Sequence, residues 1–291
     1  MRLFPNGLPL DRFLSVTLVL GAVMASLGAV AFEPRSCEVT HLEVQGAPDG
    51  IVFIADPHLR DGNLSQARTA AEQINALKPA LVLIGGDFVF GKGEDLEIHA
   101  LWSEIDAPVY AVLGNHDYHS GDHATSLIGK MVSVRSASLQ AGAYDVGHLR
   151  DETTDLAYAD EVEAVLEQHG VHVLRNEVVE LEVGGTPVRI VGVDDGWAGM
   201  ADPPALEPGD AFTIYMVHEP ECIGDWDADL VLAGHTHGGQ FLPAGVANRV
   251  GLSGESRRGT TTVYVTRGIG TSNLPWEVRA APPEIVWIGP N

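Results

Sequence analysis

Histidine, aspartate and asparagine residues gather in five short clusters, each directly after an apolar run of the chain. The clusters are DPH (56–58), GGD (85–87), GNHD (114–117), VHEP (217–220) and GHTHGGQ (234–240). They supply carboxylate, imidazole and amide ligands without a thiolate, a mixture that suits Mn²⁺, Fe or Zn²⁺ better than a structural zinc site. The candidate metal ligands are Asp56, His58, Asp87, Asn115, His218, His235 and His237.

The number of candidate ligands predicts two divalent ions. Seven side chains exceed the needs of one ion, whereas two ions about 3.5–4 Å apart can share a bridging carboxylate. Such pairs activate water and bind phosphate oxygens. GHTHGGQ alone would also fit an ordinary glycine-rich turn, because glycine permits sharp changes of backbone direction. The turn does not explain why all five clusters follow apolar runs.

Seven apolar runs have the length and composition of strands buried on both faces of a sheet. They span residues 51–55, 81–85, 109–113, 188–193, 212–217, 230–233 and 262–266. Helices are predicted at 64–78, 94–105 and 160–170, so strands and helices alternate as in α/β proteins. Ligands of such proteins bind at the carboxyl ends of the strands, where the five clusters lie. We therefore expect one site rather than five separate turns.

The chain of 291 residues is strongly acidic, with a formal charge of −23. Such a surface repels polyanions at long range, so we expect no nucleic-acid partner. Hydrophobic residues make up 45% of the chain, enough for a sizeable core. Two cysteines, Cys37 and Cys222, are too few for a disulfide framework. One bridge between them and two separate thiols both remain open.

Residues 13–32 form an uncharged, mostly apolar run of twenty residues. As a helix this run is about 30 Å long, enough to cross the core of a bilayer. Arg2 and Arg12 precede it, which favours an inside N-terminus and an extracytoplasmic domain. We expect a retained single-pass anchor in the cell membrane. The alternative is an exported chain whose signal peptide is cleaved near Ala31, after Ala-Val-Ala.

The chain divides into a short N-terminal flank (1–12), the transmembrane or signal segment (13–32), a lead-in (33–50) and one domain (51–291). Residues 118–158 interrupt the alternation of strands and helices with a polar stretch that has no clear period. We interpret this stretch as an insertion near the active edge of the domain.

The order DxH, GD, GNHD, a lone histidine after a strand, and GHxH resembles the calcineurin-like metallophosphoesterase superfamily, from residue 51 to about residue 272. GHTHGGQ and TRGIGTS (266–272), behind an apolar N-terminal segment, are similar to its membrane-associated or exported bacterial branch. That branch includes UDP-2,3-diacylglucosamine pyrophosphatase-like phosphoesterases. The chain departs from the pattern at Pro57, where relatives often carry Leu or Thr, but both flanking ligands are kept. The resemblance implies a four-layer α/β sandwich of two mixed β-sheets flanked by helices.

The resemblance also implies a role for each candidate. The first ion would be held by Asp56, His58 and His237. The second would be held by Asn115, His218 and His235, and Asp87 would bridge the two. His116 would protonate the leaving oxygen or stabilise the phosphoryl group, with Asp117 orienting and charging it. A metal-bridging hydroxide would attack phosphorus in line.

We therefore expect a metal-dependent phosphoesterase that hydrolyses a phosphoester or pyrophosphate bond, with a lipid-linked or envelope substrate favoured by the anchor. The alternatives are a broad-specificity phosphatase or phosphodiesterase, and a non-catalytic, metal-stabilised scaffold. Manganese is the expected metal, with iron and zinc as alternatives. Asp194 and Asp195 fit a turn better than a site, and His119 and His123 fit a polar surface loop.

Overall fold

The computed structural model describes residues 36–91, 93, 95–121, 130, 139–240, 242–271 and 279–291. The predicted transmembrane or signal segment at 13–32, His123 and part of the predicted insertion at 118–158 lie outside these residues. Within the described ranges, no helix combines the length and the apolar character that a membrane span requires.

The first of two large sheets is mixed and has six strands among the described residues. In spatial order they are β1 (Glu38–Val44), β14 (Glu284–Pro290), β2 (Ile51–Ile54), β3 (Leu81–Gly85), β4 (Val109–Val112) and β7 (Val171–Val173). β2, β3, β4 and β7 run parallel, β14 is antiparallel to β2, and β1 is parallel to β14. The edge that carries the carboxyl ends of β2, β3 and β4 therefore also carries the first residues of β14 and β1.

The second sheet is also mixed, with six strands in the described part of the chain. In spatial order they are β12 (Gly254–Arg258), β13 (Thr261–Val265), β11 (Leu230–Ala233), β10 (Phe212–Val217), β9 (Thr186–Gly192) and β8 (Glu177–Val183). β13, β11, β10 and β9 run parallel, while the outer strands β12 and β8 are antiparallel to their neighbours. The parallel strands are buried along most of their length.

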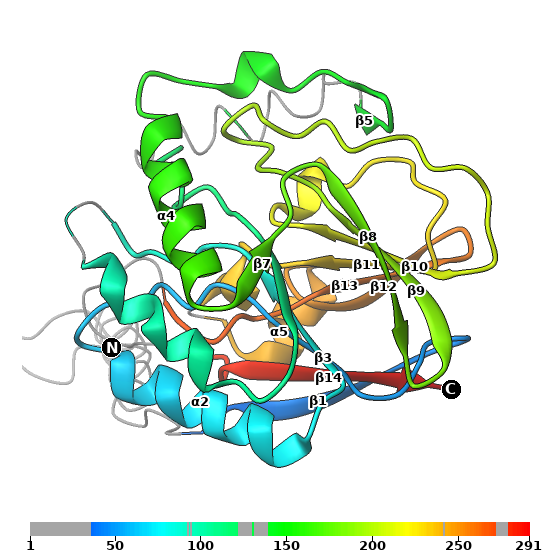
Figure 1. The fold of residues 1–291 in the computed structure, drawn as a ribbon, viewed down its shortest axis with the longest axis horizontal. Helices are drawn as coiled ribbons and strands as arrows, with labels where there is room; N and C mark the ends of the chain where they lie inside the picture. Colours follow the sequence, from blue (N-terminus) through cyan, green and yellow to red (C-terminus); the bar gives the residue numbers. More distant parts are fainter. Residues whose placement is uncertain are drawn as a thin grey trace, which may run out of the picture.

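The continuous apolar runs arise because each strand of the first sheet faces two cores. Ile51 and Phe53 of β2 pack between the two sheets. Val52 and Ile54 face the opposite way, since side chains alternate along a strand, and pack in the cluster that includes α2 (Leu64–Leu77), η1 (Leu96–Glu104) and α4 (Leu156–Gln168). Figure 1 shows α2 beside the first sheet and α4 near β7.

Short turns cover the outer face of the second sheet. The elements over this face are η2 (Gly147–Leu149), η3 (Pro220–Cys222) and the hairpin of β5 (Leu139–Gln140) and β6 (Ala143–Tyr144). Trp226 lies in the same cluster and stacks on Tyr215, with ring centroids 4.5 Å apart. Among the described residues, the longer helices α2 and α4 flank the first sheet.

All seven predicted strands are present, and their ends differ from the predicted ends by at most two residues. The predicted helix at 94–105 is a 3-10 helix, η1, and α4 begins at Leu156 rather than at 160, because Asp155 caps it by accepting the N–H of Tyr158. Residues 33–50 are more than a lead-in, because they contain β1. The two elements that follow β11 are η4 (His237–Gly239) and α5 (Ala244–Arg249).

Candidate metal centre

The five polar clusters meet at one edge of the two sheets. β2, β3 and β4 are neighbours in the first sheet, and β10 and β11 are neighbours in the second. Each of these five strands ends at the start of one of the clusters or at most two residues before it. The structure gathers the seven candidate ligands into two groups of side chains whose donor atoms lie within bonding reach of a shared ion.

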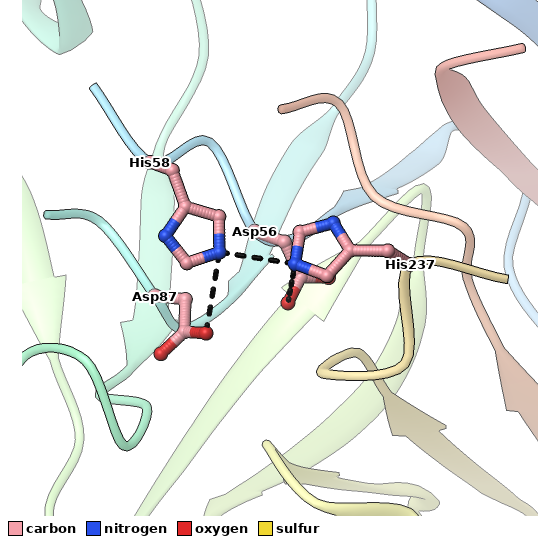
Figure 2. A group of neighbouring side chains, drawn as sticks. All are labelled: Asp56, His58, Asp87 and His237. Atoms are coloured by element: carbon pink, nitrogen blue, oxygen red, sulfur yellow. Dashed lines mark hydrogen bonds and ion pairs between the residues drawn. The ribbon is translucent and has the colours of Figure 1, made fainter. Parts of the chain in front are cut away.

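The first group contains Asp56, His58, Asp87 and His237 (Figure 2). His58 Nε2 lies 3.0 Å from His237 Nε2 and 3.4 Å from Asp87 Oδ2. His237 Nε2 lies 3.9 Å from Asp56 Oδ1. All four residues are buried. The donor atoms therefore converge among side chains that have little contact with bulk water.

The second group contains Asp87, His218 and His235, with Asn115 beside them. His218 Nε2 lies 3.1 Å from Asp87 Oδ2 and 3.3 Å from His235 Nδ1. Asn115 Oδ1 lies 3.0 Å from the same nitrogen of His235. Asp87 belongs to both groups, which is the placement that a bridging carboxylate requires.

Backbone carbonyls set the tautomers of three of these histidines. The Nδ1–H groups of His58, His218 and His237 are placed to donate to the carbonyls of Val89 (2.9 Å), Gly85 (2.7 Å) and Gly270 (3.2 Å). Each ring then presents the lone pair of Nε2 to the cluster. Two such lone pairs, on His58 and His237, would face each other at 3.0 Å. A cation between them removes this repulsion, so the donor set fits a metal ion.

A buried carboxylate oxygen points to the same conclusion. Oδ2 of Asp56 has no hydrogen-bond partner within the described residues, whereas Oδ1 accepts the N–H of His235 at 2.8 Å. A buried carboxylate oxygen without a donor is costly. A metal ion at this position would satisfy it. The residues present therefore fit a divalent ion at the first group.

Opposite pKa shifts distinguish the acids of the cluster. Burial raises the pKa of Asp56 to about 7. Burial also disfavours ionisation of Asp87, but neighbouring histidines outweigh it and hold the pKa of Asp87 well below its ordinary value. Burial, with Arg279 nearby, lowers the pKa of His237 to about 3. Burial likewise lowers the pKa of His58. Neutral imidazole is the form that binds metal.

The backbone of the ligand loops is unusual. Five of the seven candidate ligands have a positive φ: Asp56 (55°), His58 (41°), Asp87 (58°), His235 (69°) and His237 (49°). Residues with a Cβ rarely adopt this conformation, and each instance costs on the order of 1–3 kcal/mol. Favourable interactions in the surrounding structure must offset this strain energy. Backbone strain of this kind is concentrated at functional sites.

Two glycines make room for the ligands. A Cβ on Gly114 would lie 2.6 Å from the backbone nitrogen of Asp87 and 2.8 Å from Cε1 of His218. A Cβ on Gly86 would lie 2.8 Å from Nδ1 of His218, and Gly86 also has a φ of +87°. Only glycine lets the GGD and GNHD loops approach each other and His218 this closely.

His116 lies beside the first group of ligands. Its ring makes an edge contact with His58, with centroids 4.6 Å apart, and its backbone N–H donates to Asp87 Oδ1 at 2.9 Å. Its Nδ1 lies 3.0 Å from the carbonyl of Phe90. The side chain is half-buried, so Nε2 is the ring nitrogen left for a substrate. This position suits the predicted role in proton transfer.

Asp117 has a different position from the one expected. Its carboxylate accepts three backbone N–H groups, from Asp87 (3.0 Å), Val89 (3.1 Å) and Gly114 (2.9 Å). The residue is fully buried. The carbonyl of Phe90, rather than Asp117, accepts the hydrogen bond of the His116 ring. Asp117 therefore joins the GGD and GNHD loops, and its expected part in orienting His116 is corrected.

Lys130 is a residue of the site region that the sequence did not single out. Its Nζ donates to Ser120 Oγ at 2.5 Å and to the carbonyl of Trp197 at 2.6 Å. The carbonyl of Ser120 accepts Nδ2 of Asn115 at 2.8 Å, so the amide oxygen of Asn115 is the atom left to face His235. A single lysine in a polar stretch carries no signal for this role.

The other residues considered from the sequence lie outside the two ligand groups. Asp194 pairs with Arg175 at 3.1 Å, and Asp195 accepts the N–H of Ala198, as a turn residue does. His119 is buried and stacks on Tyr158 rather than lying in a surface loop. Both cysteines are buried and free.

Comparison with known proteins places this geometry in context. A family model described as calcineurin-like phosphoesterase matches residues 50–239. Phosphodiesterase YaeI of Escherichia coli is 28% identical over 284 residues, covering 89% of this chain and 92% of the relative. The uncharacterised metallophosphoesterase YkuE of Bacillus subtilis is 28% identical and covers 91% of each chain. A Danio rerio protein named transmembrane protein with metallophosphoesterase domain is 25% identical, over 90% of this chain and 59% of the relative.

Proposed function

Because the chain belongs to the calcineurin-like phosphoesterase family, and is therefore a metal-dependent phosphoester hydrolase, we propose that it uses two divalent ions to hydrolyse phosphodiester or pyrophosphate bonds. The observation that carries the proposal is the presence of Asp87 in both groups of potential ligands. The name of the Escherichia coli relative supports a diester substrate. The mixed nitrogen and oxygen ligands support manganese.

In this proposal Asp56, His58 and His237 would hold the first ion. Asn115, His218 and His235 would hold the second, and Asp87 would serve both. When bound, the ions would lower the pKa of water and neutralise charge on the phosphate oxygens.

The protein's own groups supply the remaining chemistry. The Phe90 carbonyl fixes the His116 ring through Nδ1, which leaves Nε2 to give a proton to the leaving oxygen. Asp117 holds the loops of Asp87 and Asn115 in register through three backbone hydrogen bonds. Burial of the ligands excludes competing water and strengthens their electrostatic interactions with the substrate.

We also propose that residues 13–32 anchor the enzyme in the cell membrane, with the catalytic domain outside the cytoplasm. The uncharged run of twenty residues, preceded by Arg2 and Arg12, supports this proposal. The name of the Danio rerio relative is consistent with a membrane location. An anchor would favour phosphoesters that are themselves linked to lipid or to the envelope.

The test measures metal content and hydrolysis of bis-p-nitrophenyl phosphate on the full chain loaded with Mn²⁺. We expect two ions per chain and metal-dependent hydrolysis. Asp87→Ala should reduce both, whereas Asp202→Ala, at an exposed position outside both ligand groups, should change neither. One ion per active chain would refute the dinuclear mechanism. No hydrolysis of phosphomonoesters, diesters or pyrophosphates with Mn²⁺, Fe²⁺ or Zn²⁺ would instead favour a metal-stabilised scaffold.

A further inference from the structure

The described chain enters the domain at the edge that carries the ligand cluster. The backbone N–H of Glu38, the first residue of β1, donates to the carbonyl of Pro283 at 2.8 Å, and its carboxylate pairs with Arg267 at 3.0 Å. Gly268, which follows Arg267 in the sequence, packs directly on a candidate ligand, because a Cβ there would lie 2.8 Å from Asp56 Oδ2. The start of β1 therefore contacts Arg267, and the residue after Arg267 contacts the cluster at Asp56.

Few residues connect this entry point to the apolar run. Residues 33–35 alone separate the run at 13–32 from Ser36, the first described residue. The four Cα–Cα steps from Phe32 to Ser36 span at most about 14 Å. If the run lies in a bilayer, Ser36 and the ligand edge must stay near the bilayer surface.

The same edge exposes apolar side chains. Val246 and Val250 are 43% and 61% exposed, and their i, i+4 spacing places them on one face of α5 and its C-cap. The segment is fixed to the ligand loop, because Thr236, which lies between His235 and His237, donates its hydroxyl to the Leu252 carbonyl at 2.5 Å. Among described residues, Val178 on β8 is the other large hydrophobic residue with comparable exposure.

The charge of this segment differs from that of the chain. Residues 234–254 contain one arginine, Arg249, and no aspartate or glutamate, although the whole chain has a formal charge of −23. Exposed acids lie on other segments, including Glu38 and Asp61 near this edge and Glu177, Glu180 and Glu182 on β8. A segment without acids avoids repulsion by anionic lipids, whose field extends for about a Debye length from the surface.

We propose that the ligand-bearing edge of the domain faces the membrane, with Val246 and Val250 in contact with the lipid head-group region. This inference rests on the proposed function and on the proposed anchor at 13–32. The short connection holds the edge near the bilayer, and the acid-free, apolar segment contacts it. The substrates that reach the site are then phosphoesters presented at the bilayer–water interface.

The test measures membrane contact with a fluorescent reporter. Val250→Cys and Thr260→Cys in the full chain are each labelled with a nitrobenzoxadiazole dye and reconstituted in phosphatidylcholine vesicles that contain doxyl-labelled phosphatidylcholine. Thr260 is exposed in the turn between β12 and β13, at the opposite end of the second sheet. The unsubstituted chain is the labelling control, because Cys37 and Cys222 are buried.

We expect the dye at position 250 to be quenched at least about twofold more than the dye at 260. A flexible insertion of about twenty Gly and Ser residues after Pro34 should reduce this difference, because it lengthens the connection. Equal quenching at both positions, stronger quenching at 260, or a mature chain that has lost residues 13–32 would overturn the proposal. Hydrolysis of soluble bis-p-nitrophenyl phosphate in the same samples reports separately on the proposed function.

Discussion

Replacing Gly114 by alanine tests whether close packing of the ligand loops sets the geometry of the cluster. The added methyl would lie 2.6 Å from the Asp87 backbone nitrogen and 2.8 Å from His218 Cε1. The first of these contacts is with backbone, so it cannot be relieved by rotating a side chain. Overpacking of this kind costs about 1–3 kcal/mol. At about 2–4 °C per kcal/mol for a domain of this size, the melting temperature should fall by roughly 2–12 °C.

The effect on metal binding should be more specific than the effect on stability. Relief of the clash displaces Asp87 or His218, and disturbed support of metal ligands typically costs about 10–100-fold in metal affinity or activity. The assay measures metal content, melting temperature and diester hydrolysis on one preparation. Gly147→Ala is the matched control, because its added methyl would meet no atom within 4 Å.

The reasoning predicts that Gly114→Ala loses metal affinity and that Gly147→Ala keeps it. If the two variants bind Mn²⁺ equally and melt at the same temperature, the close approach of the GGD and GNHD loops does not define the site. A fall in melting temperature with unchanged metal affinity would show that the loops relax without moving the ligands, which also contradicts the argument.

Four further changes have defined outcomes. His116→Ala should keep the bound metal and lower kcat by about 10²–10⁴-fold; loss of metal would instead make the residue a structural support. Lys130→Met should weaken metal binding more than Lys130→Arg in a metal titration, because Lys130 supports Ser120 beside Asn115. Chelation should lower the melting temperature and Mn²⁺ should restore it, by an amount that grows with free metal concentration. Burial raises the pKa of Glu221 to about 7. The stability that this acid contributes in its protonated form is therefore present below its unfolded pKa of about 4.3 and is lost as the pH rises through 7. In Glu221→Gln the melting temperature should therefore fall less across this pH range, and an identical pH dependence would contradict the assignment.

The sequence could predict the candidate ligands because the signal is local. Asp56, Asp87 and His235 each lie two residues after the end of a buried strand. Parallel strands that end together bring such residues to one edge of the sheet. The alternation of apolar strands and helices likewise predicts an α/β domain. These two features need only the period of the chain and the position of each polar cluster relative to a strand end, whereas the arrangement in two mixed sheets is implied by the resemblance to calcineurin-like phosphoesterases.

Other features could not be predicted because they depend on contacts between distant residues or on backbone atoms. The partner of the His116 ring is the carbonyl of Phe90, and a carbonyl is present in every residue. Asp117 follows His116 in sequence, yet its carboxylate faces the backbone of Asp87 and Val89. β1 is an exposed, partly polar strand whose partner lies at the other end of the chain, so its period alone does not distinguish it from a loop.

The position of β14 also constrains the order in which the molecule can form. β14 (Glu284–Pro290) lies between β1 and β2 in the first sheet, so among the described strands β1 has no neighbour until residues 284–290 are available. Pairing over such a sequence distance is slow, because a long loop must close first. During synthesis, β1 therefore stays without its strand neighbour until residues 284–290 have been translated. A chain truncated before Glu284 would leave β1 and β2 without the strand that joins them.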